Sequence, residues 1–335
     1  MGHLVQVYTT HRNLPKKNLL KENKGNLDNN LNNNLEYKNI SNINELFKKE
    51  NFVDVLVIVK DLPTLLLDIP CKVRLFLTAD GANEISTFGI GDKRYINRID
   101  CLLGMSAWHI DTLCKTSGFL MEKCEVLGNA IDLSNYSGVE KRERKRLIFT
   151  AAPYKGLELT IRLIKELREK DADIEFHSFS GFNIYDGEAP FKSDIAKEYK
   201  KVNAELEKIQ GVFIHGNILQ KDLAREYMKS ALLIYPCTWF ETGARTLLEA
   251  QAAGCPVVAS RIGATEEIVG SGGFIISEKL GSEKFYEKFK LAIIEILNND
   301  ELWSKMSLSG KMNVKNNFSD ETVAKRFEKL LLKRL

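Results

Sequence analysis

The apolar residues of this chain recur with two different periods, and the two periods alternate along the sequence. Short β-branched runs such as 53–59, Val-Asp-Val-Leu-Val-Ile-Val, indicate strands. Longer segments such as 157–170 carry an apolar residue every three or four positions, which is typical of an amphipathic helix. Strands that alternate with helices form parallel β-α-β units, so the pattern predicts an α/β protein.

The predicted elements extend over most of the chain. Strands are expected at 3–9, 53–59, 73–78, 100–106, 123–128, 147–151, 173–179, 212–215, 232–236 and 256–259. Helices are expected at 107–117, 157–170, 192–209, 220–230, 243–253, 285–298, 301–317 and 321–332. A chain of 335 residues has room for two domains of ordinary size.

A junction between two halves is predicted near residue 139. The basic run 141–146, Lys-Arg-Glu-Arg-Lys-Arg, stands just before a strand and is expected to be a solvated linker rather than a phosphate or lipid site. We therefore expect an N-terminal domain over 1–138, a C-terminal domain over 139–316 and a final helix over 317–335. Residues 11–46 are rich in Asn and Lys, cannot bury much apolar surface, and are expected to form a mobile loop.

The segment 232–260 is the most informative part of the sequence. An apolar strand is followed by a loop, a helix over 243–253, a stop at Gly254 and a second buried strand. In such a unit the functional crevice lies beyond the carboxyl ends of the strands, where the helix N-terminus points. Free N–H groups and a partial positive charge at that end suit a phosphate.

Two carboxylates flank this predicted anion site. Glu241 precedes the helix, and Glu249 lies about two turns into it. A carboxylate repels a phosphate, but it accepts directional hydrogen bonds from sugar hydroxyls. The alternative is that Glu241 is an ordinary first-turn acid and Glu249 a solvated residue on the helix face.

Composition and charge narrow the class of protein. The formal net charge is only +3, which gives no support to a nucleic-acid-binding role. The six cysteines are scattered without a Cys-x-x-Cys pair, so reduced thiols and a cytoplasmic location are expected rather than a zinc cage or disulfide framework. No apolar run approaches the roughly 18 residues of a membrane span, and no Asp-x-Asp metal motif occurs.

The segment 235–260, with 263–269 after it, resembles the donor-site signature of family 4 retaining glycosyltransferases. The resemblance covers roughly residues 50–330 and is densest at 147–157 and 231–269. It implies the GT-B architecture, in which two Rossmann-like domains with parallel sheets face each other across the active site. It also implies that the last helix crosses back to pack on the N-terminal domain.

The resemblance assigns a role to each candidate residue of the donor site. By resemblance, Glu249 accepts the ribose hydroxyls of the nucleotide, and Glu241 contacts hydroxyls of the transferred sugar. The remaining candidates are the amides of Thr242, Gly243 and Ala244 for sugar and phosphate, Thr246 and Leu247 near the phosphates, and Gly181 and Ile218 near the base.

Two positions depart from the family pattern. The family places an Arg and a Lys five residues apart to neutralise the departing diphosphate. Lys155 matches the Lys, but Thr150 stands in place of the Arg. This departure weakens the phosphate clamp unless Arg245 or Arg261 is the residue that replaces the missing charge.

In the N-terminal half, the family's sugar-contacting His is replaced by Ala79, and Asp80 remains. Two interpretations of Asp80 stay open: a residue that orients the acceptor hydroxyl, and an ordinary loop aspartate. The segments 106–109 and 129–132 resemble family landmarks that shape the fold, and His109 is expected to be structural.

The start of the sequence resembles the second strand of the family's N-terminal domain. By that comparison the first strand, its glycine-rich loop and the first helix are missing. The expectation is that the sheet begins with the strand at 4–9 and exposes an edge or leaves a gap. A start at an internal methionine and a shortened, impaired protein both remain open.

The resemblance implies transfer of a sugar from a nucleotide-sugar donor to a glycan or lipid-linked acceptor, with retention at the anomeric carbon. No cofactor and no metal are expected, and peripheral contact with a membrane remains an open expectation. Two alternatives stay open. One is another GT-B enzyme such as a nucleotide-sugar epimerase, although the five histidines form no cluster in the sequence. The other is a non-catalytic relic that binds a sugar nucleotide.

Overall fold

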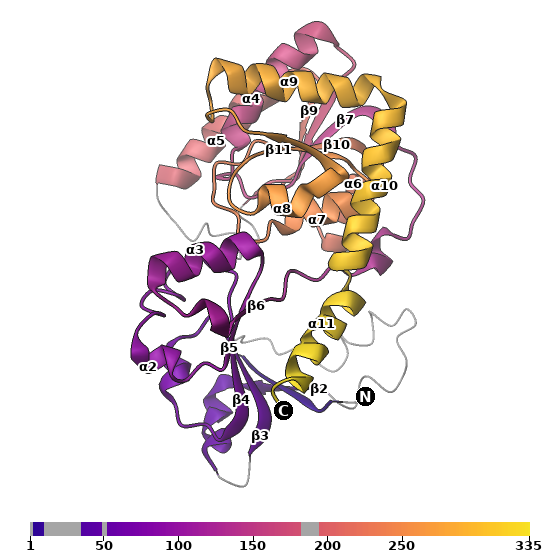
Figure 1. Ribbon diagram of the computed structural model, residues 1–335. Helices are drawn as coiled ribbons and strands as arrows, with labels where there is room; N and C mark the ends of the chain where they lie inside the picture. The colour runs from indigo at the N-terminus through magenta and orange to yellow at the C-terminus, as the bar shows by residue number, and fades with distance from the viewer. Residues whose placement is uncertain (1–2, 10–34, 49–51, 182–193) are drawn as a thin grey trace.

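A computed structural model describes residues 3–9, 35–48, 52–181 and 194–335. The ribbon has two lobes, one built mainly from the first 140 residues and the other from the rest (Figure 1). Each lobe contains a parallel sheet with helices packed against it. The predicted α/β class and the GT-B architecture are confirmed, while the domain limits at 138 and 316 stay a prediction.

The C-terminal lobe is a six-stranded parallel sheet in the order β12-β11-β10-β7-β8-β9. Its strands are β7 (Glu143–Phe149), β8 (Glu175–Ser178), β9 (Val212–Ile214), β10 (Ser230–Tyr235), β11 (Val257–Ser260) and β12 (Gly273–Ile276). Its helices are α4 (Leu157–Lys170), α5 (Asp194–Glu207), α6 (Gln220–Lys229), α7 (Arg245–Ala252), α8 (Thr265–Val269), α9 (Glu283–Asn298) and α10 (Asp300–Asn317).

The strand order reverses between β7 and β10. From β7 the chain moves outward to β8 and β9, then returns to β10 on the other side of β7. In an open parallel sheet, ligands bind beyond the carboxyl ends of the two strands where the order reverses. This topology places the loop after β7, residues 150–156, beside the loop after β10, residues 236–244.

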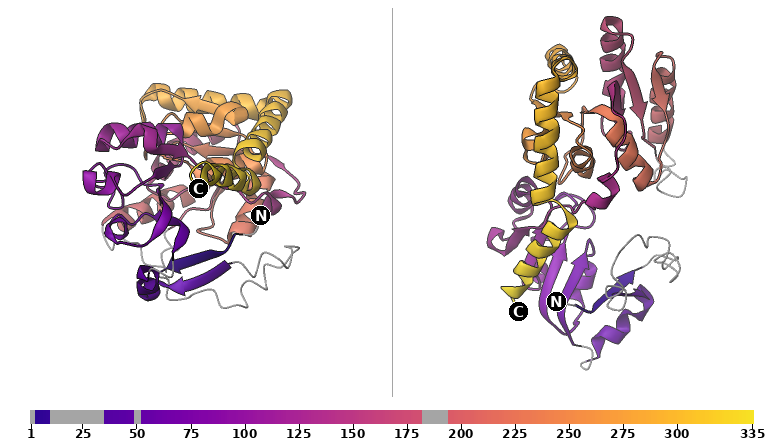
Figure 2. Two further views of the ribbon diagram at one scale, coloured as in Figure 1. Left: turned by 60° about the horizontal axis from the view of Figure 1, so that its bottom comes forward. Right: turned by 90° about the vertical axis from the view of Figure 1, so that its right-hand side faces the viewer.

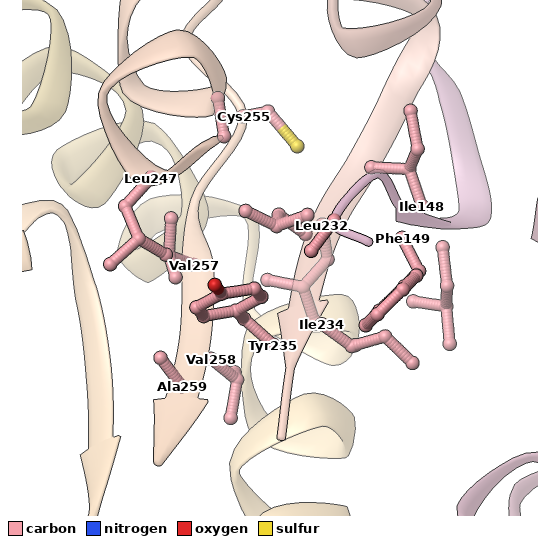
Figure 3. Close-up of a cluster of buried hydrophobic side chains, with 14 of the residues drawn as sticks. Ile148, Phe149, Leu232, Ile234, Tyr235, Leu247, Cys255, Val257, Val258 and Ala259 are labelled. Atoms are coloured by element: carbon pink, nitrogen blue, oxygen red, sulfur yellow. The ribbon is translucent and has the colours of Figure 1, made fainter. Parts of the chain in front are cut away.

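The core of this lobe explains why the sequence forms these strands. Ile148, Phe149, Leu232, Ile234 and Val257 are fully buried, because both faces of a central parallel strand are covered by helices. Figure 3 shows these side chains packed together, with the ring of Tyr235 among them. A phenol hydroxyl in such a core needs a hydrogen-bond partner, and that partner belongs to the site described below.

The predicted solvated linker at 141–146 is only partly right: Lys141, Glu143, Arg144 and Lys145 are exposed, but most of the segment belongs to a strand and two of its arginines are covered. Strand β7 begins at Glu143, four residues before the predicted start, and Arg146 is only 7% exposed. The guanidinium of Arg142 donates to the carbonyl oxygens of Ser230 (2.7 Å) and Ala253 (3.3 Å) and lies over the ring of Trp303. Charge alone suggested exposure, but carbonyl oxygens and an aromatic ring cover the half-buried Arg142, and the carboxylates of Glu143 and Glu226 pair with the buried Arg146.

The N-terminal lobe contains a four-stranded parallel sheet in the order β3-β4-β5-β6. Its strands are β3 (Val53–Val59), β4 (Cys71–Leu77), β5 (Cys101–Gly104) and β6 (Cys124–Val126), and its helices are α2 (Lys93–Ile96) and α3 (Ala107–Ser117). Strands β1 (Val5–Thr9) and β2 (Leu35–Asn39) form a separate parallel pair. The strand predicted at 4–9 therefore does not begin the four-stranded sheet. Among the described residues, the strand order has a break between β1–β2 and β3.

Part of the predicted mobile loop at 11–46 is wrong as well. Residues 35–39 are β2, and a 3-10 helix, Ile40–Phe47, follows. Strand β2 pairs in register with β1, Val5 opposite Leu35, so its backbone bonds come from a partner 30 residues away that composition cannot reveal. The remainder of the predicted loop, 11–34, lies outside the described residues.

The last helix, α11 (Asp320–Leu332), crosses back onto the N-terminal lobe, as predicted (Figure 2). Its Leu330 packs into a cluster on one face of β4 and β5, formed by Val73, Leu75, Cys101 and Leu103. The two chain segments that connect the lobes run side by side. The N–H of Ile131 donates to the carbonyl of Phe318 (2.8 Å), and the N–H of Asp320 donates back to Ile131 (3.1 Å).

Candidate active site between the lobes

The loops after β7 and β10 meet in a buried ion pair. Lys155, from the loop after β7, donates from Nζ to Oε1 of Glu241 at 2.6 Å. The hydroxyl of Tyr235, at the end of β10, donates to the same oxygen at 2.5 Å. Glu241 is only 5% exposed. The alternative that Glu241 is an ordinary surface acid therefore does not fit the structure.

The groups around the Lys155–Glu241 pair favour the charged form of Lys155. Burial alone would lower the pKa of Lys155, but the Glu241 carboxylate outweighs burial and raises that pKa. Burial and then Glu241 raise the pKa of the Cys237 thiol to about 12. The Cys237 thiol and the Tyr235 hydroxyl are therefore neutral. Of these three side chains, Lys155 is the one that brings a positive charge to the buried Glu241.

Two glycines allow the loops to approach backbone to backbone. Gly156 has φ +99°, and a Cβ there would lie 2.1 Å from the carbonyl oxygen of Pro236. Gly263 has φ +59°, and a Cβ there would lie 2.2 Å from the carbonyl oxygen of Glu241. The N–H of Ala264 donates to that same oxygen at 2.7 Å. The backbone of Glu241 is therefore held by the loop after β11, and the neighbouring Pro236 lies against Gly156.

Glu249 is also buried, at 5% exposure, on the second turn of α7. Its Oε1 accepts from Nε of Arg245 at 2.8 Å. Burial raises the pKa of this carboxyl, while Arg245, Gln220 and Tyr227 oppose the shift to a smaller extent. Glu249 is not the solvated residue of the alternative interpretation.

The N-terminal end of α7 carries the predicted amide donors. Ala244 precedes the helix with φ +26°, and no side chain caps this end. In the part of the chain that the structure describes, the N–H groups of Gly243 and Ala244 donate to no other atom. These two groups are therefore available to an anion.

Two of the predicted phosphate residues lie deeper than the sequence suggested. The side chain of Leu247 is fully buried in the core, and its N–H donates to the carbonyl of Ala244 at 2.9 Å. Leu247 has no polar group left for a phosphate. Thr246 is half-buried and its carbonyl accepts from the Tyr227 hydroxyl at 3.5 Å.

Thr150, in place of the family's Arg, bonds to Tyr227. Its Oγ1 and the Tyr227 hydroxyl are 2.5 Å apart. Of the two arginines expected to replace the missing charge, Arg261 forms an ion pair with Glu266 at 2.6 Å. Arg245 begins α7, at the anion-binding end, and 58% of its side chain is exposed. Arg245 is also paired with an acid, Glu249 at 2.8 Å, so only its place at the start of α7 favours it over Arg261.

The residues predicted near the base lie together at the carboxyl ends of β8 and β9. A Cβ on Gly181 would lie 2.9 Å from Oδ1 of Asn217. Ile218 follows Asn217 and is 37% exposed. Gln220, two residues further, begins α6 and influences the carboxyl of Glu249. This loop therefore extends the site from Glu249 toward the β9 side of the sheet.

The N-terminal lobe contributes Asp80, which follows β4. Its carboxylate pairs with Lys60 and accepts from the Ser86 hydroxyl. Lys60 has φ +57°, a backbone conformation that non-glycine residues rarely adopt and that clusters at functional sites. The sequence analysis did not find Lys60, because no motif marks it.

A cavity of about 230 Å³ lies at this end of the N-terminal lobe. It is lined by Val59, Lys60, Leu77, Ala79, Met105, Leu127, Gly128, Asn129 and Ala130.

His109 has the surroundings expected of a structural residue. It is 1% exposed, and its Nδ1 accepts from the N–H of Met105 at 3.1 Å. Its Nε2 donates to the carbonyl of Asp80 at 2.9 Å. Burial lowers the pKa of the imidazole, so the ring is neutral and fixes the loop that carries Asp80.

Direct hydrogen bonds join the two lobes at the site. The hydroxyl of Ser106 donates to the carbonyl of Thr242 (2.6 Å), and Nδ2 of Asn129 donates to the carbonyl of Gly243 (3.0 Å). The hydroxyl of Thr242 donates to the carbonyl of Ala79 (2.7 Å). The carboxylate of Glu267, on α8, accepts from the first two N–H groups of α3 at 2.9 and 3.1 Å.

The described residues contain no group of three or more His, Cys, Asp and Glu side chains that could hold a metal ion. The expectation that no metal is needed stays a prediction. No helix in the described part of the chain is long and apolar enough to span a membrane.

Comparisons with known proteins identify the family of the C-terminal half of the chain. The family model for glycosyl transferases group 1 matches residues 139–312. Spore coat protein SA of Bacillus subtilis is 28% identical over 106 residues, which is 31% of this chain and 27% of that protein. The chain thus spans about a quarter of the length of this curated relative.

Solved structures share the fold. A glycosyltransferase from Rickettsia africae has a TM-score of 0.74 at 17% identity, with 99% of this chain and 90% of that chain covered. The Anabaena protein Alr3699/HepE, in complex with UDP and glucose, has a TM-score of 0.62 at 14% identity, with 78% and 72% covered. At these identities the likeness concerns the fold alone.

Proposed function

The chain belongs to the glycosyl transferases group 1 family, and from this premise we propose that it transfers a hexose from a nucleotide sugar with retention at the anomeric carbon. The observation that carries the proposal is the Lys155–Glu241 pair beside the uncapped N-terminal end of α7; Glu241 lies on the same β-α-β unit as Glu249, and Lys155 comes from the neighbouring loop after β7. The cation and the free N–H groups suit a diphosphate. The two buried carboxylates suit the hydroxyl groups of a sugar and of a ribose.

The proposed roles follow from charge. Lys155 and the N–H groups of Gly243 and Ala244 stabilise the diphosphate as it leaves. Glu241 accepts hydrogen bonds from sugar hydroxyls, and Glu249 accepts those of the ribose. The acceptor hydroxyl attacks from the face that the diphosphate leaves, and a phosphate oxygen takes its proton. In this mechanism the protein supplies position and charge, and no side chain forms a covalent bond.

We assign the acceptor to the N-terminal lobe, where Asp80 follows β4. The acceptor is a glycan or a lipid-linked molecule. A peripheral membrane contact is supported by the apolar side chains of Ile85 and Phe88, which are 99% and 74% exposed, with Lys93 and Arg94 close in sequence. The cytoplasmic location remains part of this proposal, supported by six cysteines that are all free thiols.

The non-catalytic alternative rests on Thr150 and Ala79, which replace a cation and a histidine of the family pattern. The epimerase alternative has less support, because the described histidines near β8 and β9 pair with each other instead of facing a substrate. Nδ1 of His177 lies 3.0 Å from Nε2 of His215. A transfer assay separates the enzyme from the non-catalytic alternative.

We predict that the two buried glutamates separate nucleotide binding from sugar transfer. Glu249→Ala is expected to weaken UDP binding at least tenfold, since charge-assisted hydrogen bonds are each worth about 1.5–3 kcal/mol. Glu241→Gln is expected to spare UDP binding and to lower turnover. UDP is the first probe because the Anabaena structure is a complex with UDP. Calorimetry with UDP, and turnover on a panel of nucleotide sugars, measure both effects.

Three outcomes decide between the assignments. Unchanged UDP affinity in a folded Glu249→Ala variant contradicts the ribose role. A tenfold loss of UDP affinity in Glu241→Gln shows that the two roles are wrongly divided. Nucleotide binding without transfer or hydrolysis of any donor favours the non-catalytic alternative.

We also predict that nucleotide affinity falls on acidification because of Glu249. Burial raises the pKa of this carboxyl, so it takes up a proton at a higher pH than an ordinary glutamate. Affinity is full above the raised pKa and is lost as the pH falls through it. The unfolding free energy has the opposite dependence and falls as the pH rises between the ordinary and the raised pKa, because the folded state holds the proton more tightly.

Calorimetric titration with UDP over a pH series tests this dependence. The Glu249→Gln variant, which cannot ionise, is expected to bind more weakly than the wild type at neutral pH and to lose the acid-side decline. An acid-side decline of the same size in both proteins assigns the titration to another group.

A further inference from the structure

The carbonyl groups of the loop before α7 are held by the opposite lobe. Ser106 donates to the carbonyl of Thr242, and Asn129 donates to the carbonyl of Gly243. Ser106 is the N-cap of α3, and Asn129 lies in the connection after β6. Two successive peptide units of the C-terminal lobe are therefore oriented by side chains of the N-terminal lobe.

Because each peptide unit is planar, a hydrogen bond that fixes its carbonyl group also fixes the direction of its N–H group. The described chain has no cis peptide bond. In a trans peptide the C=O and N–H bonds point in opposite directions. A bond to the carbonyl of Thr242 therefore directs the N–H of Gly243 away from Ser106, and a bond to the carbonyl of Gly243 directs the N–H of Ala244 away from Asn129. Successive N–H groups that point to one side form an anion-binding concavity.

The backbone here is strained and closely packed. Ala244 has φ +26° at 6% exposure, and strain of this kind persists only where the surroundings over-determine it. A Cβ on Gly243 would lie 2.7 Å from Cβ of Met105 and 2.8 Å from Nδ2 of Asn129. The N-terminal lobe thus packs directly against the peptide units to which the N–H groups of Gly243 and Ala244 belong.

We propose that Asn129 and Ser106 are positioning residues of the donor site, which hold the N–H groups of Gly243 and Ala244 in place for the donor diphosphate. This inference rests on the proposed function. Neither side chain touches the donor. Both act through the peptide carbonyls, so the diphosphate site is complete only while the lobes are in contact. By linkage, diphosphate binding then favours lobe closure to the same extent.

The test compares the affinity for UDP, which carries the diphosphate, with the affinity for uridine, which lacks it. Asn129→Ala is expected to weaken UDP binding about tenfold, because the N–H of Ala244 is then no longer held in place for a charge-assisted hydrogen bond to the diphosphate. The affinity for uridine is expected to stay unchanged. Uridine contacts only the Glu249 side of the site and lacks the phosphates. Asn129→Asp is expected to weaken UDP binding further, since a carboxylate repels the Gly243 carbonyl. Asn129 is chosen because Ser106 also caps α3 through the N–H of His109 (3.0 Å).

Asn135→Ala is the matched control. Asn135 lies in the same connection and bonds only to the neighbouring Asp132 among the described residues, so its replacement is expected to leave both affinities unchanged. Unchanged UDP affinity in folded Asn129→Ala overturns the inference and leaves the proposed function intact. Equal losses for UDP and uridine also overturn it, because they indicate a general structural effect. If the wild type binds none of UDP, GDP and ADP, the proposed function fails and the inference fails with it.

Discussion

Replacing Lys155 with methionine is expected to lower turnover of the nucleotide sugar by about 10²–10³-fold, the usual effect of removing one group that stabilises charge in the transition state. Methionine keeps the length of the side chain and removes its charge. Because Thr150 replaces the second cation of the family pattern, the proposed mechanism gives Lys155 most of the charge that faces the leaving diphosphate. Single-turnover measurements with the best donor of the panel report this effect directly.

The same variant is expected to be less stable, since Glu241 stays buried without its cation. Breaking a buried pair from one side costs on the order of 3 kcal/mol. The double variant Lys155→Met/Glu241→Gln removes both charges and is expected to recover most of the stability while turnover stays low. Denaturant unfolding of the single and double variants measures the coupling.

Lys145→Met is the control for the loss of a lysine. Lys145 pairs with Asp171 and Asp173 at the surface, so its replacement is expected to leave turnover unchanged. If Lys155→Met keeps turnover within threefold of the wild type, another group neutralises the diphosphate. Arg245, at the start of α7, is then the residue to replace next.

Gly243→Ala is expected to have the second large effect, a loss of turnover of about a hundredfold. The new Cβ would lie 2.7 Å from Cβ of Met105, a rigid atom of the opposite lobe, so the lobes must separate or the loop must shift. A displacement of about 1 Å at a reacting centre can lower the rate about 10²-fold. Overpacking of this kind also lowers the unfolding free energy by about 1–3 kcal/mol. Steady-state kinetics and thermal unfolding measure the two effects.

Gly138→Ala provides the matched comparison. Gly138 also connects the lobes, but its added Cβ meets only the end of the Met228 side chain, at 3.4 Å. This variant is expected to keep wild-type turnover. Wild-type kinetics in Gly243→Ala as well would show that the contact between the lobes at this loop is not needed for transfer.

Local sequence determined the β-α-β unit from β10 to β11. Its signals are short-range: an apolar run that forms each strand, good helix formers with a glycine stop at Gly254, and two glutamates separated by seven residues. These features depend on neighbours within about ten positions, where period and capping rules apply. The family resemblance rests on the same segment, and the fold that it implied is the one observed.

Local patterns failed where a distant segment supplies the partner. Residues 35–39 have the composition of a loop and form a strand because β1 pairs with them. The basic run before β7 has the composition of a linker, but Arg142 and Arg146 are covered by carbonyls, an aromatic ring and carboxylates.

The contacts of the candidate site itself were decided by the tertiary structure. Lys155 and Glu241 are 86 positions apart and meet because the strand order reverses between β7 and β10. Asn129 and Gly243 are 114 positions apart and meet because α11 and the 127–142 connection bring the two lobes together. Sequence by itself determined which residues could bind a phosphate or a sugar, since that depends on the chemistry of each side chain. Only the strand order of the C-terminal sheet and the contact between the two lobes determined which of them share one site, because that depends on distances that no local pattern encodes.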